Sequence, residues 1–129
     1  MNNILNKSDL KTETDIKLLV DRFYEKVIID PVIGMIFTEV VELSWEKHIP
    51  VMYSFWNSIL FGANTYTGNP MIKHIELNKM FPLKTDHFER WLLLWEETVY
   101  ENFSGEIADQ AVSRAGNIAS IMQTKINIA

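Results

Sequence analysis

The sequence predicts an all-α fold, and three observations support this. Apolar residues recur at helical spacing in four long stretches, and prolines or glycine-containing turns separate these stretches. No stretch shows the strict alternation of apolar and polar residues that is typical of a half-buried β-strand. With 129 residues, 47% of them hydrophobic, the chain is long enough to form one substantial core rather than a disordered segment. We therefore expect one domain over residues 1–129, with about four substantial helices and two short ones, and with residues 1–11 loosely ordered.

Charge and composition exclude several classes of partner and site. The formal net charge of −5 argues against nucleic acid or an anionic membrane as the main partner. The chain has no cysteine, which excludes disulfides, thiolate metal sites and a cysteine nucleophile. The first residues lack the pattern of a signal peptide, and no apolar run reaches membrane-spanning length. We expect a cytoplasmic protein.

The first helix is expected to begin near Glu13, with Thr12 or Thr14 as its cap, and to end before Pro31. Its apolar face consists of Ile16, Leu19, Val20, Phe23, Tyr24 and Val27. A buried tyrosine needs a hydrogen-bond partner for its hydroxyl, so Tyr24 indicates a polar group in the interior. A hydroxyl that reaches the surface is the commoner alternative. A helical turn or two should follow over residues 31–37, carrying Phe37 inward.

A second helix over residues 43–61 has an apolar face made almost entirely of aromatic and thioether side chains. This face contains Trp45, His48, Met52, Phe55, Trp56 and Ile59. Pro50 interrupts the run, so we expect a kink or a new helix start near His48 and Ile49. An aromatic stripe is usually just core, but a buried imidazole is less common because its nitrogens need partners.

Residues 62–69 form a turn-rich loop, and a short helix that opens with Pro70 carries His74. On its own, such a histidine is more often a hydrogen-bonded core residue than a ligand.

Two long helices complete the chain. The first should run over residues 85–103, capped by Thr85 or Asp86, with Phe88, Trp91, Leu92, Trp95, Thr98 and Val99 buried. The second should run over residues 106–126, with an apolar face of Ile107, Ala111, Ala115, Ile118, Ile121, Met122 and Ile126. The alanines at positions 111, 115 and 119 would allow another helix to approach closely.

The three histidines do not form a recognisable zinc site. His48, His74 and His87 fall in three different segments, and their surroundings are aromatic rather than acidic. No phosphate-binding loop, nucleophile elbow or HExxH motif is present. The pattern instead suits a flat, aromatic-lined slot with a histidine on one side and polar donors on the other, which is how proteins hold haem.

Four stretches of the sequence resemble the group III truncated haemoglobins, short two-on-two globins of bacteria. They are Phe23–Val27, Trp45–Met52 with Phe55 and Trp56, Tyr66–Leu77, and His87–Trp95, and the likeness runs from about Ile16 to Lys125. The resemblance implies a truncated globin fold, a two-on-two helical sandwich, in which helices near 13–29 and 43–61 pack against 85–103 and 106–126. It also implies haem b as cofactor. Residues 78–80 depart from the family's proline-rich turn, which puts the local geometry at the haem edge in doubt.

The resemblance assigns roles to individual residues. His74 corresponds to the proximal haem iron ligand, whereas Tyr24, His48 and Trp91 correspond to residues that contact or gate the gas ligand on the distal side. Lys73 and Arg90, with His87, are candidates for propionate pairing or for fixing the haem edge, and His87 could instead cap its helix. The residues expected to line the haem slot are Phe37, Met52, Phe55 and Trp56.

These roles suit the binding of O₂, NO or another diatomic ligand, because two donors that stabilise a partly negative ligand should slow its release. NO dioxygenase or peroxidase-like turnover, supported by a reductase, would fit better than bulk oxygen transport. Two alternatives remain open from the sequence. One is a haem-free globin-like module that binds an apolar ligand or a partner protein, and the other is a non-haem metal enzyme that uses the histidines.

Overall fold

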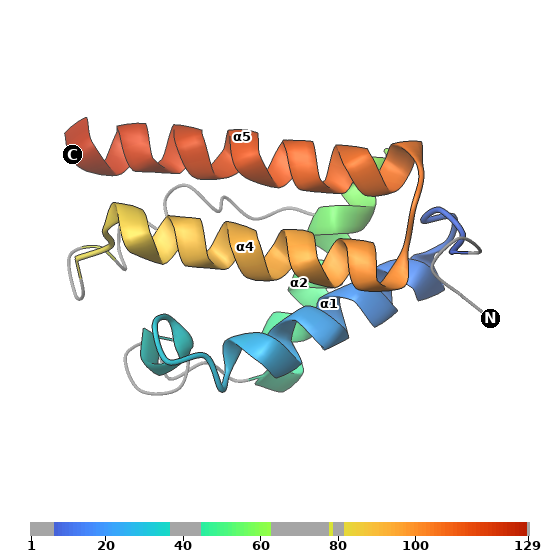
Figure 1. Cartoon of the computed structure of the whole chain (residues 1–129), viewed down its shortest axis with the longest axis horizontal. Helices are drawn as coiled ribbons and strands as arrows, with labels where there is room; N and C mark the ends of the chain where they lie inside the picture. Colours follow the sequence, from blue (N-terminus) through green and yellow to red (C-terminus); the bar gives the residue numbers. More distant parts are fainter. Residues whose placement is uncertain (1–6, 37–44, 63–77, 79–81, 129) are drawn as a thin grey trace.

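A computed structural model of the chain describes residues 7–36, 45–62, 78 and 82–128. Within these ranges the regular structure is entirely helical and consists of α1 (Glu13–Val27), α2 (Trp45–Phe61), α4 (Thr85–Asn102) and α5 (Glu106–Ile128) (Figure 1). Among the described helices, none combines the length and the apolar character that crossing a membrane requires. The short helix expected around His74 lies outside the described residues.

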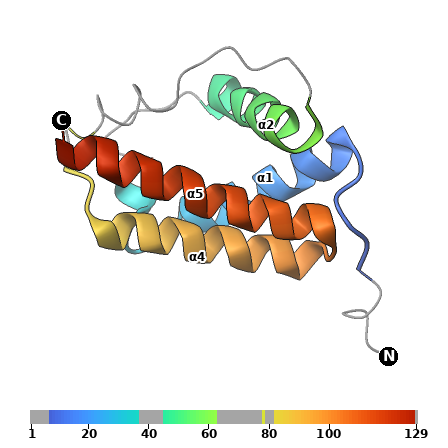
Figure 2. The same ribbon diagram turned by 90° about the horizontal axis from the view of Figure 1, so that it is seen from above.

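The four helices pack as two pairs. α4 and α5 lie side by side and run in opposite directions, while α1 and α2 form the second layer (Figures 1 and 2). α1 contacts both α2 and α4, and α2 also contacts α5, so the four helices enclose a common interior. The predicted all-α, two-on-two sandwich is confirmed.

α1 begins where the sequence indicates. The Asp15 N–H donates to the Thr12 hydroxyl at 3.2 Å, and the Thr12 N–H donates to the Asp15 carboxylate at 3.2 Å, so two N–H groups at the helix start have partners. The six apolar residues of the expected face are all buried. The helix ends at Val27, earlier than the expected end near residue 29. A turn and a short helical segment then follow over residues 31–36.

α2 runs without interruption from Trp45 through Pro50 to Phe61. Of the two expectations for this position, a kink or a new helix start near His48 and Ile49, the new start is therefore wrong, and the kink stays a prediction. Pro50 lies in the second turn, where its ring removes one backbone hydrogen bond, and the turns on either side keep theirs. On the inner face Trp56 is buried, while Met52, Phe55 and Ile59 are partly buried.

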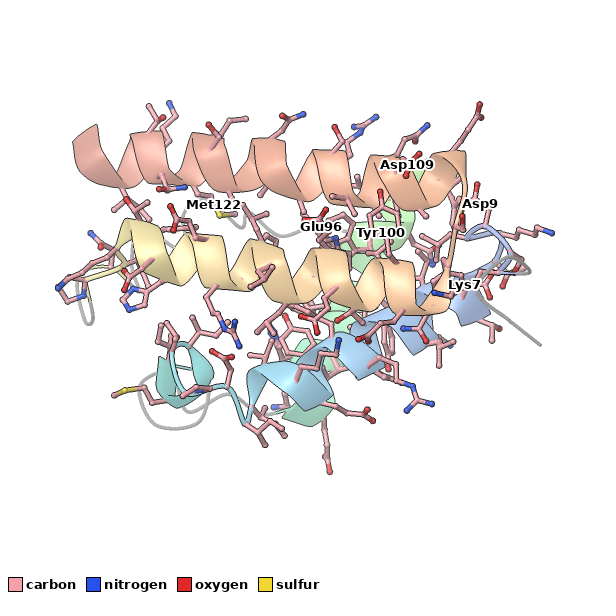
Figure 3. All side chains as sticks on the ribbon, viewed as in Figure 1. Lys7, Asp9, Glu96, Tyr100, Asp109 and Met122 are labelled. Atoms are coloured by element: carbon pink, nitrogen blue, oxygen red, sulfur yellow. The ribbon has the colours of Figure 1, made fainter. Side chains whose placement is uncertain are left out.

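Small side chains bring α4 and α5 together. The expected alanines at 111, 115 and 119 are buried, as is Ala108, and the Trp95 indole N–H of α4 donates to the Ala111 carbonyl of α5 at 3.1 Å. Met122 projects between the two helices (Figure 3). Some details of the expected faces were wrong: Leu94 is buried, Ile121 is 52% exposed, and Trp91 and Leu92 are only partly buried.

The cap of α4 also differs from the expectation. The residue preceding the helix is Lys84, whose N–H donates to Nδ1 of His87 at 2.9 Å, while the His87 N–H donates to the Lys84 carbonyl at 3.0 Å. Neither Thr85 nor Asp86 takes the capping position, because both already lie inside the helix. His87 thus has the capping role that the sequence left as an alternative.

Residues 7–11 are anchored to the fold, contrary to the expectation that they are loosely ordered. Leu10 is only 1% exposed, and the Asp9 carboxylate accepts the backbone N–H groups of Ile107 and Ala108 at 2.9 and 2.8 Å. Lys7 and Asp9 lie at the turn between α4 and α5 (Figure 3). Asp9 therefore caps a helix that is distant in the sequence, which local pattern alone does not reveal.

Candidate functional site

The centre of the candidate site is a contact between Tyr24 of α1 and His48 of α2. The Tyr24 hydroxyl lies 3.2 Å from Nε2 of His48, and the two rings meet edge to face with their centroids 5.5 Å apart. Tyr24 is only 7% exposed, so its hydroxyl has a partner inside the protein, as the sequence indicated. Two of the three residues that the resemblance placed on the distal side are therefore neighbours.

Burial controls the protonation of Tyr24. Removal from water raises the pKa of its hydroxyl above the ordinary value of 10.0, so the group stays protonated and remains a donor. The tautomer of His48 then decides where that proton points. An unprotonated Nε2 accepts it, whereas a protonated Nε2 donates to the Tyr24 oxygen and leaves the hydroxyl proton directed at a third group.

Trp91 lies on α4 beside the same aromatic cluster. Its ring meets Phe23 edge to face with centroids 6.0 Å apart, and Phe23 in turn contacts Tyr24 at 5.1 Å. Trp91 is partly buried, and no acceptor for its indole N–H is found within the part of the chain that the structure describes. The side chain thus offers a donor close to the Tyr24 and His48 pair.

α2 supplies the apolar wall of the site. Met52 and Phe55 are partly exposed on its inner face, whereas Trp56 is 1% exposed and stacks on Trp95 with centroids 4.4 Å apart. Met52 and Phe55 therefore have surface available for a ligand, while the Trp56 ring is mainly packed into the core.

Arg90 is engaged by a buried carboxylate. Its Nε and Nη2 both lie 2.7 Å from one oxygen of Asp30, and the second Asp30 oxygen accepts the N–H groups of Val32 and Ile33 at 3.0 and 3.1 Å. Burial alone would raise the pKa of Asp30, but the Arg90 guanidinium and the two N–H groups outweigh it and lower that pKa. A propionate that paired with Arg90 would have to share it with Asp30.

The sequence reasoning did not identify Asp30, although a signal was present. An aspartate directly before a proline is a common start for a helical turn, since the carboxylate caps the turn and proline fits its first position. Three expected site residues, Phe37, Lys73 and His74, lie outside the described residues. Within the described ones, no group of three or more His, Asp or Glu side chains is placed to hold a metal ion.

Comparison with known proteins identifies the family of the chain. The chain matches the bacterial-like globin family over residues 9–124. It is 32% identical over 123 residues to a group 3 truncated hemoglobin of Campylobacter jejuni, covering 93% of this chain and 94% of that protein. The crystal structure of a group III truncated hemoglobin from Campylobacter jejuni superimposes with a TM-score of 0.81 at 31% identity, again covering 93% and 94% of the two chains.

The family match spans nearly all of the chain, and the fold agrees with that of a solved group III protein. The chain therefore belongs to the bacterial-like globin family, as a group III truncated haemoglobin.

Proposed function

We propose that this globin binds haem b through His74 and holds O₂ or NO on the opposite face with Tyr24, His48 and Trp91. The observation that supports this most strongly is the buried Tyr24 hydroxyl 3.2 Å from Nε2 of His48. A buried tyrosine needs a hydrogen-bond partner, and here that partner is the imidazole that the family resemblance also assigns to the distal side. Family membership supplies the proximal role of His74, which lies outside the described residues.

The described residues fit a large planar apolar group. Phe55 and Met52 of α2 and Trp91 of α4 are partly exposed although they adjoin the main core. Large apolar side chains gain free energy when their remaining surface is covered, and a porphyrin would cover it. In addition, every buried polar side-chain atom among the described residues has a partner, so no unpaired polar group of theirs in the interior opposes an apolar ligand.

Haem iron, when bound, supplies the coordination position at which a diatomic gas binds. The protein's own residues then determine how long the ligand stays. The Tyr24 hydroxyl is kept protonated by burial, and the Trp91 N–H cannot be deprotonated at neutral pH, so both can donate to a partly negative ligand. His48 competes with a bound ligand for the hydroxyl proton of Tyr24, whereas no acceptor among the described residues competes for the Trp91 N–H.

Two donors favour retention of the ligand over rapid delivery. We therefore propose chemistry between O₂ and NO, or reduction of peroxide, rather than bulk oxygen transport. Turnover of either kind consumes electrons, so it requires a reductase or another one-electron donor as partner.

An absorbance spectrum of the haem-reconstituted protein tests the cofactor. We expect a Soret band that is lost or strongly shifted in His74→Ala. The matched control is His87→Ala, which removes a histidine whose ring caps α4, and this variant should keep the band. A band that survives unchanged in His74→Ala would contradict the proposed ligand.

The second candidate is a haem-free globin-like module that binds an apolar ligand or a partner protein. The partly exposed Met52, Phe55 and Trp91 would suit such a ligand equally well. Absence of a Soret band after reconstitution of the correctly folded protein would favour this candidate over the haem protein.

A further inference from the structure

We propose that Trp91, Trp95 and Trp56 form an electron-donating stack, which gives up one electron when hydrogen peroxide is reduced at the proposed haem site. The inference rests on the proposed function, because it requires bound haem. It assigns a use to Trp95 and Trp56, which the ligand-binding account leaves as ordinary core residues.

The three indoles are in consecutive contact and nearly parallel. Trp91 and Trp95 lie one turn apart on α4, with ring centroids 6.4 Å apart and planes 4° from parallel. Trp56 of α2 stacks on Trp95, with centroids 4.4 Å apart and planes at 19°. The Phe23 ring packs at right angles to both Trp91 and Trp95, with centroid distances of 6.0 and 5.1 Å. The stack thus joins two helices across the core.

One end of the stack lies beside the candidate site and the other is enclosed. Trp91 is partly buried and is linked through Phe23 to Tyr24. Trp95 and Trp56 are each only 1% exposed. An electron vacancy created at Trp91 can therefore move away from the site into rings that solvent does not reach.

The surroundings of Trp95 favour a radical that keeps its proton. Its indole N–H donates to the Ala111 carbonyl at 3.1 Å, and a backbone carbonyl is too weak a base to remove that proton. Loss of an electron thus leaves an indole radical cation that can spread over parallel neighbours. Tyr24, by contrast, must release its proton when it is oxidised, and the group placed to take it is Nε2 of His48.

The electron balance is simple. Hydrogen peroxide takes up two electrons and two protons from solvent and yields two molecules of water. Bound haem would supply one of these electrons, and the tryptophan stack supplies the other, which leaves the indole radical cation. Two equivalents of a soluble one-electron reductant such as ascorbate then restore one electron to the stack and one to the haem group, and the reductant is itself oxidised.

Electron paramagnetic resonance after rapid mixing of the ferric haem protein with one equivalent of peroxide tests this directly. The radical signal should narrow when the chain is made with ring-deuterated tryptophan and should keep its width with ring-deuterated tyrosine. Trp95→Phe, which breaks the stack in its middle, should reduce the tryptophan signal at least several-fold. The control is Tyr53→Phe, an aromatic change on α2 at a residue bonded to Asp21, and it should leave the signal unchanged.

A signal that narrows only with deuterated tyrosine, or the absence of any protein radical from a preparation with a normal Soret band, would overturn the stack and leave the haem assignment intact. An equally strong tryptophan signal in Trp95→Phe would also overturn it. Absence of the Soret band would remove the proposed function and this inference together. The isotope experiment uses the unaltered chain, so it gives an answer even if Trp95→Phe does not fold.

Discussion

At the scale of single residues, the Asp30 side chain connects the turn that follows α1 with helix α4. Its side chain is 2% exposed and serves three donors at once, the Arg90 guanidinium and the N–H groups of Val32 and Ile33. Because Arg90 precedes Trp91, this carboxylate also fixes the part of α4 that faces the candidate site. The position of Trp91, which we propose as a distal donor, thus depends on the adjacent ion pair between Arg90 and Asp30.

Asp30→Asn should destabilise the protein by about 1–3 kcal/mol at neutral pH, as expected for a buried charged group that loses hydrogen bonds. An amide has one acceptor oxygen, so either Arg90 or the backbone N–H groups lose their partner. Urea denaturation of the two proteins measures the difference.

The difference in stability between Asp30→Asn and the unaltered protein should also depend on pH. The folded-state pKa of Asp30 is below 3.8, so the unfolded chain binds its proton first and the carboxylate's contribution is fully present above 3.8. The contribution is lost as the pH falls through the lower folded-state pKa, and the stability difference from Asp30→Asn should shrink over that range. A difference that stays constant down to the acid transition would show that the charge of Asp30 does not matter.

At single residues, the sequence predicted a contact where a buried polar side chain required a hydrogen-bond partner. Burial of Tyr24 in a helix face required a polar partner, and His48 was the imidazole in the facing stripe. Such prediction failed for Asp9, because nothing near that residue shows that its partners are the N–H groups of Ile107 and Ala108.

At the scale of elements, the turn between α4 and α5 is built around the carboxylate of Asp9. Gly105 has φ of +142°, a region that side chains rarely adopt, and a Cβ there would lie 2.5 Å from Cγ of Asp9. The Ser104 N–H donates to the Ser8 carbonyl at 3.0 Å, which holds the two segments together. The absence of a side chain at position 105 is thus what lets the N-terminal segment cap α5.

Gly105→Ala should lower the free energy of unfolding by about 2 kcal/mol or more, since it adds backbone strain and displaces the cap. The matched control is Gly116→Ala, at a helical glycine of α5 whose Cβ would meet nothing within 4 Å. This change should instead stabilise the protein, by about 0.5–1 kcal/mol. Thermal denaturation of both variants measures the contrast, and equal effects would contradict the role assigned to the turn.

The helices themselves were largely predictable, because periodicity reports which side of a helix is buried. The positions of the helix ends were less predictable. Pro50 appeared to be a break but lies within a continuous α2, and the imidazole of His87 replaces the hydroxyl or carboxylate cap expected for α4. In both places tertiary packing or a less common cap outweighed the local preference.

At the scale of the whole molecule, the four helices place Tyr24, His48 and Trp91 around one interior, each from a different helix. Periodicity predicted the number of helices, whereas their two-on-two arrangement followed from resemblance to the family. Spacing alone does not determine which helices face each other, because many packings bury the same stripes. The contact between Tyr24 and His48 was predictable in the same way, through residue types and family motifs, whereas the roles of these residues at a haem stay predictions.

The rate of O₂ dissociation from the ferrous haem protein tests the central claim most directly. Loss of a hydrogen bond to a charged acceptor costs about 1.5–3 kcal/mol, so Trp91→Phe should speed release by about tenfold or more. Tyr24→Phe should change the rate at least several-fold, and Tyr53→Phe, whose hydroxyl bonds Asp21, should not change it. Release from both Trp91→Phe and Tyr24→Phe at the rate of the unaltered protein would contradict the account, since neither donor would then hold the ligand.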